Sequence, residues 1–365
     1  KQGESLYTIA KQYGVSVISL YQNNPQLNGR STIMPGEQLI ITYDQEKLGS
    51  FEVNGYGEPS ISDDLLRKTL PYLTYVTPFT YGLTQSGSLV MLNDNHMIDI
   101  AKEYDTAPLM HLSTLTEKGN FDSARASIVL NNQMIQDKLI DEIIENMNDK
   151  GYYGLDVDFE FINKQDAEKY AAFISNLRSR LNPLGYEVIT ALAPKISAMQ
   201  RGTIYEGHLY KEIGIASNAV FVMTYEWGYT YGPPQAVSPL PNVRAVLDYA
   251  VSEIPREKIF MGISNYGYDW TLPFEKGDKA RSISNDEAIK LAIQYGAEIQ
   301  YDETAQAPYF HYYDKRGREH VVWFEDARSI QAKLALIPEY GLRGAGYWNI
   351  MRPYFGIKQN TNYSR

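Results

Sequence analysis

The sequence YGLDVDFE, residues 153–160, decides both the fold and the chemistry of this chain. Successive side chains of a β-strand point to opposite faces, so Asp156, Asp158 and Glu160 share one face and the intervening Leu, Val and Phe share the other. An edge strand with a solvated acidic face is one interpretation of this pattern. The apolar second face and the apolar Phe161-Ile162 pair that follows favour a central strand of a parallel sheet instead.

Three carboxylates on one strand face indicate acid–base chemistry rather than packing. Neighbouring like charges repel, and each carboxylate loses hydration if the face is enclosed. Their pKa values are thereby pushed apart, so one group stays protonated near neutral pH while another is ionised. Hydrolysis of a glycosidic bond needs such a pair, so we expect a glycosidase.

The composition fits a globular protein with one large domain and one small one. The chain has 365 residues, and 44% of them are hydrophobic. Its 34 basic and 44 acidic residues give a formal charge of −10, which argues against nucleic-acid binding. The 30 tyrosines suit sugar-binding surfaces because they can both stack and donate hydrogen bonds, although tyrosine is also common packing material.

Metal sites, cofactors and membrane spans are not predicted. The chain has no cysteine, and its five histidines are scattered without the spacing of metal ligands. No apolar run reaches the roughly 18 residues that a membrane helix needs. The first residues are unlike a signal peptide, and a start inside a longer precursor is one explanation.

Residues 1–43 predict a separate small module of βααβ type. Two short helices end at Gly14 and at Asn24-Pro25, and a turn at Pro35-Gly36 leads into a strand over Gln38–Ile41. This pattern resembles a LysM module, which implies binding of N-acetylglucosamine-containing glycans. The alternative is that the loop residues only make turns. The glycan contacts implied by the resemblance are Gly3, Glu4, Ser5, Leu6, Ile33, Met34 and Pro35.

After a linker at residues 44–50, strand-like and helix-like segments alternate through residues 51–365. Eight strands with helical connections, such as 130–147 and 167–181, predict an α/β fold of the (β/α)8 barrel type, with the active site at the carboxyl ends of the strands. A small α+β insertion is expected near 270–324, after the seventh strand, with a hairpin near its end. The expected strands are 51–55, 72–79, 107–113, 153–160, 187–193, 219–225, 258–265 and 343–348.

Three marks along this barrel resemble glycoside hydrolase family 18, the chitinase-like enzymes. The family signature Asp-Gly-x-Asp-x-Asp-x-Glu matches from Gly154 to Glu160, with Tyr153 in place of its first Asp. The family's Met-x-Tyr-Asp reads Met223 to Glu226 here, with Glu for Asp. The Trp at the end of the last strand falls on Trp348.

The resemblance implies a retaining, substrate-assisted mechanism. Glu160 would protonate the leaving oxygen while the 2-acetamido group of the sugar attacks the anomeric carbon. Asp158 would stabilise the acetamido nitrogen, Asp156 would set the protonation of Asp158, and Tyr225 would hold the acetamido oxygen. The absence of the first Asp at Tyr153 would weaken the proton relay without removing the acid.

Substrate contacts are expected around this centre. Trp348 would form a hydrophobic floor under the reacting sugar, and the alternative is a barrel plug. Tyr56 is a candidate sugar contact whose alternative is packing. The remaining candidates for the subsites are Met223, Glu226 and Trp227.

The combination of a LysM module and this barrel resembles the cortical-fragment-lytic N-acetylglucosaminidases of bacilli. It implies cleavage after N-acetylglucosamine in spore cortex peptidoglycan during germination, by a monomer found in the spore cortex or coat or at the cell wall. A chitinase, an endo-N-acetylglucosaminidase on other glycans and a non-catalytic spore-coat glycan-binding protein remain the alternatives. Glu160 argues against the non-catalytic one.

Overall fold

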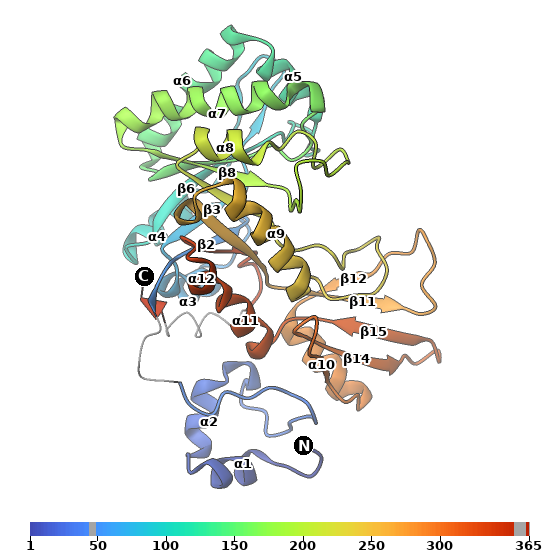
Figure 1. The fold of residues 1–365 in the computed structure, drawn as a ribbon. Coiled ribbons are helices and arrows are strands. Elements are labelled where there is room, and N and C mark those ends of the chain that lie inside the picture. Colours follow the sequence, from blue (N-terminus) through green and yellow to red (C-terminus); the bar gives the residue numbers. More distant parts are fainter. Residues whose placement is uncertain (44–48, 354–362, 365) are drawn as a thin grey trace.

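The structure is a computed structural model that describes residues 1–43, 49–353 and 363–364. It has three parts: the N-terminal module, a barrel, and a small sheet inserted near the end of the barrel (Figure 1). Most of the expected linker, residues 44–48, lies outside the described residues. Strand β1 (Gly49–Ser50) pairs in parallel with β17 (Tyr363–Ser364).

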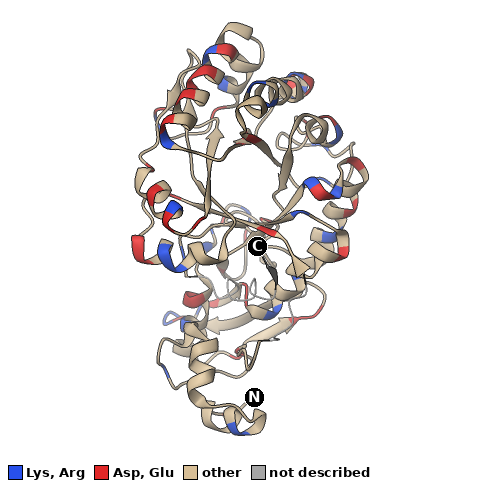
Figure 2. Cartoon of the chain, turned by 90° about the vertical axis from the view of Figure 1, so that its left-hand side faces the viewer, with Lys and Arg blue, Asp and Glu red and all other residues tan. Residues whose placement is uncertain are grey.

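Within the described residues, eight parallel strands close into the barrel that the sequence predicts. They follow the order β10-β16-β2-β3-β6-β7-β8-β9 around the ring, which Figure 2 shows with the helices outside it. A short hairpin of β4 (Gly82–Leu83) and β5 (Leu89–Val90) follows β3. The barrel strands are β2 (Glu52–Gly57), β3 (Tyr75–Pro78), β6 (Ala107–Ser113), β7 (Gly154–Asp158), β8 (Glu187–Leu192), β9 (Ala219–Val222), β10 (Ile259–Ser264) and β16 (Gly344–Trp348).

The outer helices bury an apolar stripe against the strands and carry charges of both signs on their exposed faces (Figure 2). The expected helix over 130–147 is confirmed as α6, which begins three residues later because the Asn132 side chain caps it by accepting from Ile135 N. The helices are α3 (Asp63–Thr69), α4 (Asn95–Glu103), α5 (Ser123–Leu130), α6 (Gln133–Lys150), α7 (Ala167–Leu181), α8 (Tyr210–Ala216), α9 (Leu240–Glu253), α11 (Ala327–Leu334) and α12 (Leu336–Tyr340), with 3-10 turns η2 (Leu70–Tyr72), η3 (Lys164–Asp166), η4 (Asn182–Leu184) and η5 (Arg256–Lys258).

An ion-pair network lies at the amino-terminal end of the barrel. Arg343, just before β16, donates to Glu52 at 2.7 Å and to Glu187 at 2.9 Å, and it also reaches the Tyr75 hydroxyl at 3.2 Å. These partners come from β2, β8 and β3, so the network ties distant strands together. Polar groups at this end of a barrel contribute to stability and leave the opposite end for chemistry.

The insertion is a five-stranded antiparallel sheet with one helix. Its strand order is β12-β11-β15-β14-β13, and the predicted hairpin at its end is confirmed as β14 and β15. The sheet stands beside the barrel (Figure 1), and its strand β11 follows β10 of the barrel directly in the chain. Its elements are β11 (Gly267–Thr271), β12 (Arg281–Ile283), α10 (Asn285–Tyr295), β13 (Gln300–Asp302), β14 (Ala307–Tyr313) and β15 (Glu319–Trp323).

The N-terminal module consists of α1 (Leu6–Tyr13), α2 (Val17–Asn23) and the 3-10 turn η1 (Pro25–Leu27) around a small apolar core. The predicted strand over 38–41 is wrong: no strand of the described module pairs with this segment, and none is formed there. The Asn24 side chain takes the place of a strand partner, since it accepts from Ile40 N at 2.7 Å and donates to Ile40 O at 2.7 Å.

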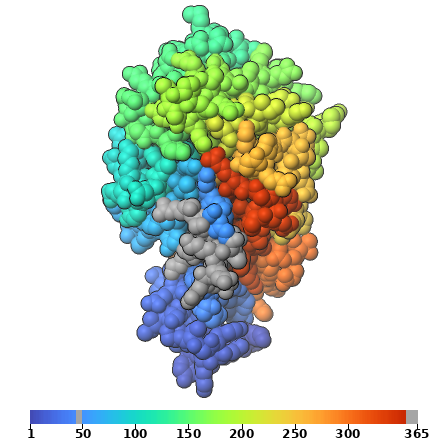
Figure 3. Space-filling view, turned by 60° about the vertical axis from the view of Figure 1, so that its left-hand side comes forward, coloured from blue at the N-terminus to red at the C-terminus, as the bar shows by residue number. Residues whose placement is uncertain are grey.

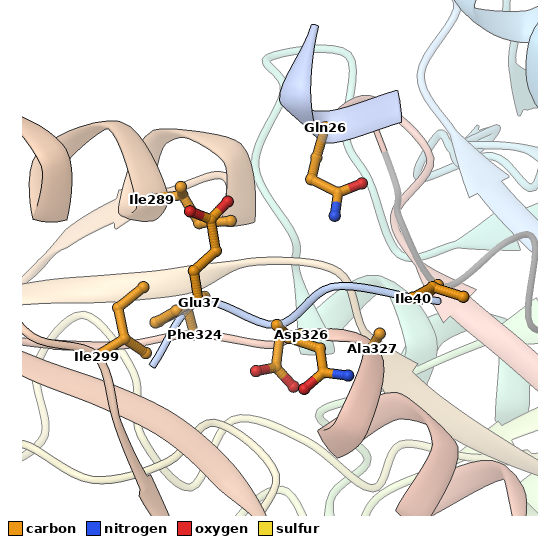
Figure 4. Close-up of a pocket in the computed structure, with 9 residues that line it drawn as sticks. Gln26, Glu37, Ile40, Ile289, Ile299, Phe324, Asp326 and Ala327 are labelled. Carbon is orange, nitrogen blue, oxygen red and sulfur yellow. The ribbon is translucent and has the colours of Figure 1, made fainter. Parts of the chain in front are cut away.

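The module packs against the insertion rather than standing apart (Figure 3). Ile299 N donates to Pro35 O at 3.1 Å. Gly36 lies at φ 80°, and a Cβ there would come within 1.7 Å of Ile299 O, so this approach requires glycine. Figure 4 shows a small cavity at this contact, lined by Gln26, Glu37, Gln38 and Ile40 of the module and by Ile289, Ile299, Phe324, Asp326 and Ala327.

This packing limits the glycan contacts expected in the module. Pro35 already faces the insertion, and Leu6 is a core residue that is 4% exposed. Ser5 is the N-cap of α1 and accepts from Thr8 N. Gly3 is exposed, and Glu4, Ile33 and Met34 are half-buried.

Candidate active site

A cleft opens at the carboxyl ends of the barrel strands. Glu160 follows β7, Pro194 follows β8, and Trp348 ends β16, so strands distant in sequence contribute to one site. This is the end of the barrel where the sequence places the chemistry. The lining consists of Phe79, Phe121, Asp158, Glu160, Pro194, Ile204, Tyr205, Met223, Tyr225, Glu226 and Trp348.

The acidic face of β7 points into the barrel, as the alternation of the sequence predicts. Asp156 is fully buried and Asp158 is 7% exposed. The Tyr56 hydroxyl donates to Asp156 Oδ2 at 2.6 Å, and His111 Nε2 lies 3.6 Å from Asp158 Oδ2. In each aspartate the Oδ1 atom is buried and has no partner among the described residues. The Oδ1 atom of Asp158 is therefore free to accept a hydrogen bond from a substrate in the cleft.

Glu160 has the properties of a general acid. Burial, followed by the charges of Asp158 and Glu226, raises its pKa to about 8. Burial also raises the pKa of Asp156 to about 6, although His111 and the Tyr56 hydroxyl oppose the shift. A carboxyl group with a pKa of about 8 is mostly protonated at pH 7, so Glu160 can donate a proton there.

Glu226 has an unusual backbone conformation, with a φ of 70°. Non-glycine residues occupy this region at a cost, which is typical of functional positions. Its carboxylate accepts hydrogen bonds from the Tyr266 hydroxyl and, at 3.0 Å, from the Tyr268 hydroxyl. Burial raises the pKa of Glu226, and the two hydroxyl groups oppose this rise. The insertion, which begins with these tyrosines, thus fixes one carboxylate of the cleft.

The structure gathers most of the predicted substrate contacts in the cleft. Met223, Tyr225, Glu226 and Trp348 all line it. The Trp348 ring packs against Phe79, with ring centroids 4.8 Å apart, and its remaining surface borders the cleft, which suits a floor under a sugar.

Three other positions lie elsewhere. Tyr56 is 3% exposed and its hydroxyl donates to Asp156, so it presents little surface to a sugar. Trp227 packs against the main hydrophobic core and is not among the described residues that line the cleft. Tyr153 precedes β7 at the opposite end of the strand from Glu160, where its ring lies 5.8 Å from that of Tyr75.

Several residues of the site were missed from the sequence. His111 is the β6 partner of Asp156 in the parallel register, and Tyr266 follows β10. Their position at the carboxyl ends of predicted strands is a signal that could have identified them. The cleft residues Phe79, Phe121, Ile204 and Tyr205 lie in loops after β3, β6 and β8.

Comparison with known proteins agrees with this geometry. Residues 70–352 match the family described as glycosyl hydrolases family 18, and residues 1–42 match the LysM domain. The chain belongs to glycoside hydrolase family 18. It is therefore a glycosidase with an N-terminal LysM module, as the sequence predicts.

Several relatives of the chain come from bacilli. The chain is 44% identical over 306 residues to the cortical fragment-lytic enzyme of Bacillus subtilis (strain 168), covering 82% of this chain and 71% of that protein. It is 39% identical to the cortical fragment-lytic enzyme of Bacillus anthracis, with 97% and 94% covered. The crystal structure of the spore cortex-lytic enzyme SleL of Bacillus megaterium QM B1551 matches with a TM-score of 0.84 at 39% identity, covering 100% of this chain and 85% of that one.

Proposed function

We propose that this chain hydrolyses the β-1,4 bond that follows N-acetylglucosamine in spore cortex peptidoglycan. The observation that carries the proposal is the Asp158–Glu160 pair in the cleft, with Glu160 protonated at neutral pH. The names of the relatives from Bacillus subtilis and Bacillus anthracis support cortex fragments as the substrate. We propose as well that the chain acts in germination and lies in the spore or at the bacterial wall; the word cortical in the relatives' names and the LysM match support the location.

The proposed mechanism uses the substrate's own acetamido group as nucleophile. Glu160 gives its proton to the leaving oxygen as the acetamido carbonyl oxygen bonds to the anomeric carbon, and the glycosidic bond breaks. Asp158, with its unpaired Oδ1, accepts from the acetamido N–H and balances the positive charge of the resulting oxazolinium ion. The Glu160 carboxylate then removes a proton from water, whose oxygen bonds to the anomeric carbon as the bond from that carbon to the acetamido oxygen breaks; this restores the acetamido group and gives net retention of configuration.

Two further residues support this chemistry from their positions in the structure. Tyr225 lines the cleft, and burial raises the pKa of its hydroxyl well above the usual value, so it remains a donor for the acetamido oxygen. Asp156, two residues before Asp158, accepts a hydrogen bond from Tyr56, and the charge of Asp158 contributes to the raised pKa of Asp156.

The pH profile should reveal the contribution of Glu226 to the acid. A general acid must be protonated, so kcat/KM should fall as the pH rises through about 8. Replacing Glu226 with Gln removes a negative charge that raises the pKa of Glu160, so the alkaline limb should move to lower pH by about one unit. Rates measured from pH 5 to 10 on a soluble cortex fragment test this, with Glu145→Gln on the exposed face of α6 as the control. An alkaline limb in the same place for both variants would contradict the coupling.

The LysM module is proposed to hold the enzyme on insoluble glycan. Deleting residues 1–43 should reduce pelleting with purified cortex by about tenfold, because the second binding site is lost. Hydrolysis of soluble fragments should change little, which also controls for the integrity of the barrel after the contact with the insertion is removed. Pelleting equal to that of the full chain would refute the role of the module.

Chitin is the main rival substrate, since Trp348 and the acid pair would suit any N-acetylglucosamine polymer. The products discriminate between the two. Cortex cleavage with new N-acetylglucosamine reducing ends supports the proposal, whereas turnover of chitin oligosaccharides alone supports the rival. The oligomeric state is proposed to be monomeric and is measured by light scattering.

A further inference from the structure

A second groove is lined by residues from the start of α7 and from the connection between β8 and α8. These segments can be followed in Figure 1. Pro194 and Tyr205 line the cleft, and their chain neighbours Lys195 and Glu206 line the groove. The two hollows therefore share a wall. Consecutive residues of the same two segments border both hollows, which places the groove next to the cleft.

Lys195 is an unusual member of this groove. It is 2% exposed, and the one hydrogen bond of its ammonium group within the described residues goes to His208 O at 2.9 Å. No carboxylate of the described residues lies within ion-pair distance of it. Burial lowers its pKa. A buried ammonium without an ion-pair partner is costly, and an anion bound nearby would offset that cost.

The charges around Lys195 favour an anion as well. Lys164 and Arg201 also line the groove, against the carboxylates of Glu168 and Glu206. Glu206 already pairs with Lys164 at 3.3 Å and accepts from Gly202 N. The groove thus has a positive balance in a chain of formal charge −10. Among the cations of the groove, Lys195 and Arg201 form no ion pair with Glu206 within 4.0 Å.

We propose that this groove binds a carboxylate carried by a muramyl residue next to the N-acetylglucosamine in the cleft. The inference rests on the proposed function, because that function is what brings a muramyl residue to the cleft. The carboxylate is either that of the lactyl group or that of a peptide attached to it. A muramic lactam has no such charge, so the groove makes the enzyme prefer muramyl residues with a free acid or a peptide.

The test compares four soluble oligosaccharides of equal length. One contains muramic acid with its free lactyl carboxylate, one a peptide-substituted muramyl residue, one the lactam, and one only N-acetylglucosamine. The variants are Arg201→Gln, which is exposed, and Lys195→Met, which keeps the length of a buried side chain. The matched control is Lys68→Gln. Lys68 is an exposed residue of α3, which does not line the groove.

The ratio of kcat/KM for the charged oligosaccharide to kcat/KM for the lactam should fall about tenfold in Arg201→Gln and Lys195→Met, because a charge-assisted hydrogen bond is lost. It should stay unchanged in Lys68→Gln. The arm with the larger fall, free acid or peptide, identifies the source of the carboxylate. Equal ratios in all variants would overturn the inference while leaving the proposed function intact.

Failure of the proposed function gives a different result. In that case the unmodified enzyme cleaves none of the muramyl oligosaccharides, and the groove is tested by binding instead. Calorimetric titration of Glu160→Gln protein, with and without Arg201→Gln, should still show weaker binding of the charged oligosaccharides in the double variant. Equal affinities would overturn the inference. If Lys195→Met fails to fold, Arg201→Gln alone decides the outcome.

Discussion

Replacing Glu160 with Gln is expected to lower kcat on cortex fragments by about 10²- to 10⁴-fold, the usual contribution of a positioned general acid. Glutamine has nearly the same shape but no proton of suitable acidity, so the glycosidic oxygen would leave unprotonated. The variant lacks the carboxyl group whose pKa is raised to about 8. In the proposed mechanism, no other carboxylate described in the cleft protonates the leaving oxygen.

The measurement is mass spectrometry of the reducing ends released from purified spore cortex. The unmodified enzyme should release fragments that end in N-acetylglucosamine, and the variant should release almost none. Glu145→Gln, on the exposed face of α6, should behave as the unmodified enzyme. Binding to cortex should survive in Glu160→Gln, because the LysM module is unchanged. Near-full activity of this variant would refute the assignment of the acid, and muramic ends would refute the assignment of the bond.

The barrel could be predicted from the sequence because its signals are local. Alternating apolar and acidic residues predict a strand such as 154–158, and apolar residues with a period of 3.6 predict each helix. The carboxylates of Asp156 and Asp158 follow the same alternation within the strand, and Glu160 comes two residues after its end. Even the insertion was visible, because the connection after the seventh strand was too long for one helix.

Other parts of the site depend on contacts between distant segments, which a pattern along the chain does not contain. The left-handed backbone of Glu226 is stabilised by Tyr266 and Tyr268, about 40 residues later in the chain. Tyr56 was expected to touch sugar, but its hydroxyl is directed at Asp156, 100 residues away. The contact of Gly36 with Ile299 is equally long-range, and it turns the neighbouring Pro35 towards the insertion.

Replacing Asp158 with Asn is expected to have the second largest effect, a fall in kcat of about 10²- to 10³-fold. The amide keeps the shape of the side chain but does not balance the positive charge that develops on the acetamido group. Asp158 is 7% exposed, and its Oδ1 has no partner among the described residues. The substitution should therefore weaken the interaction with the substrate rather than the stability of the fold. Asp149→Asn, at the exposed end of α6, is the matched control.

The Asp158→Asn variant also has a signature that a merely structural role would not produce. Asp158 contributes the largest charge effect that raises the pKa of Glu160, so its neutralisation should lower that pKa. The residual activity should then lose its alkaline limb near pH 8 and fall at a lower pH, whereas a variant that was only misfolded would keep the position of the limb. A pH profile of kcat/KM from pH 5 to 10 decides between them. If the limb stays near pH 8 while kcat is low, Asp158 supports the fold of the site, and the charge coupling between Asp158 and Glu160 is wrong.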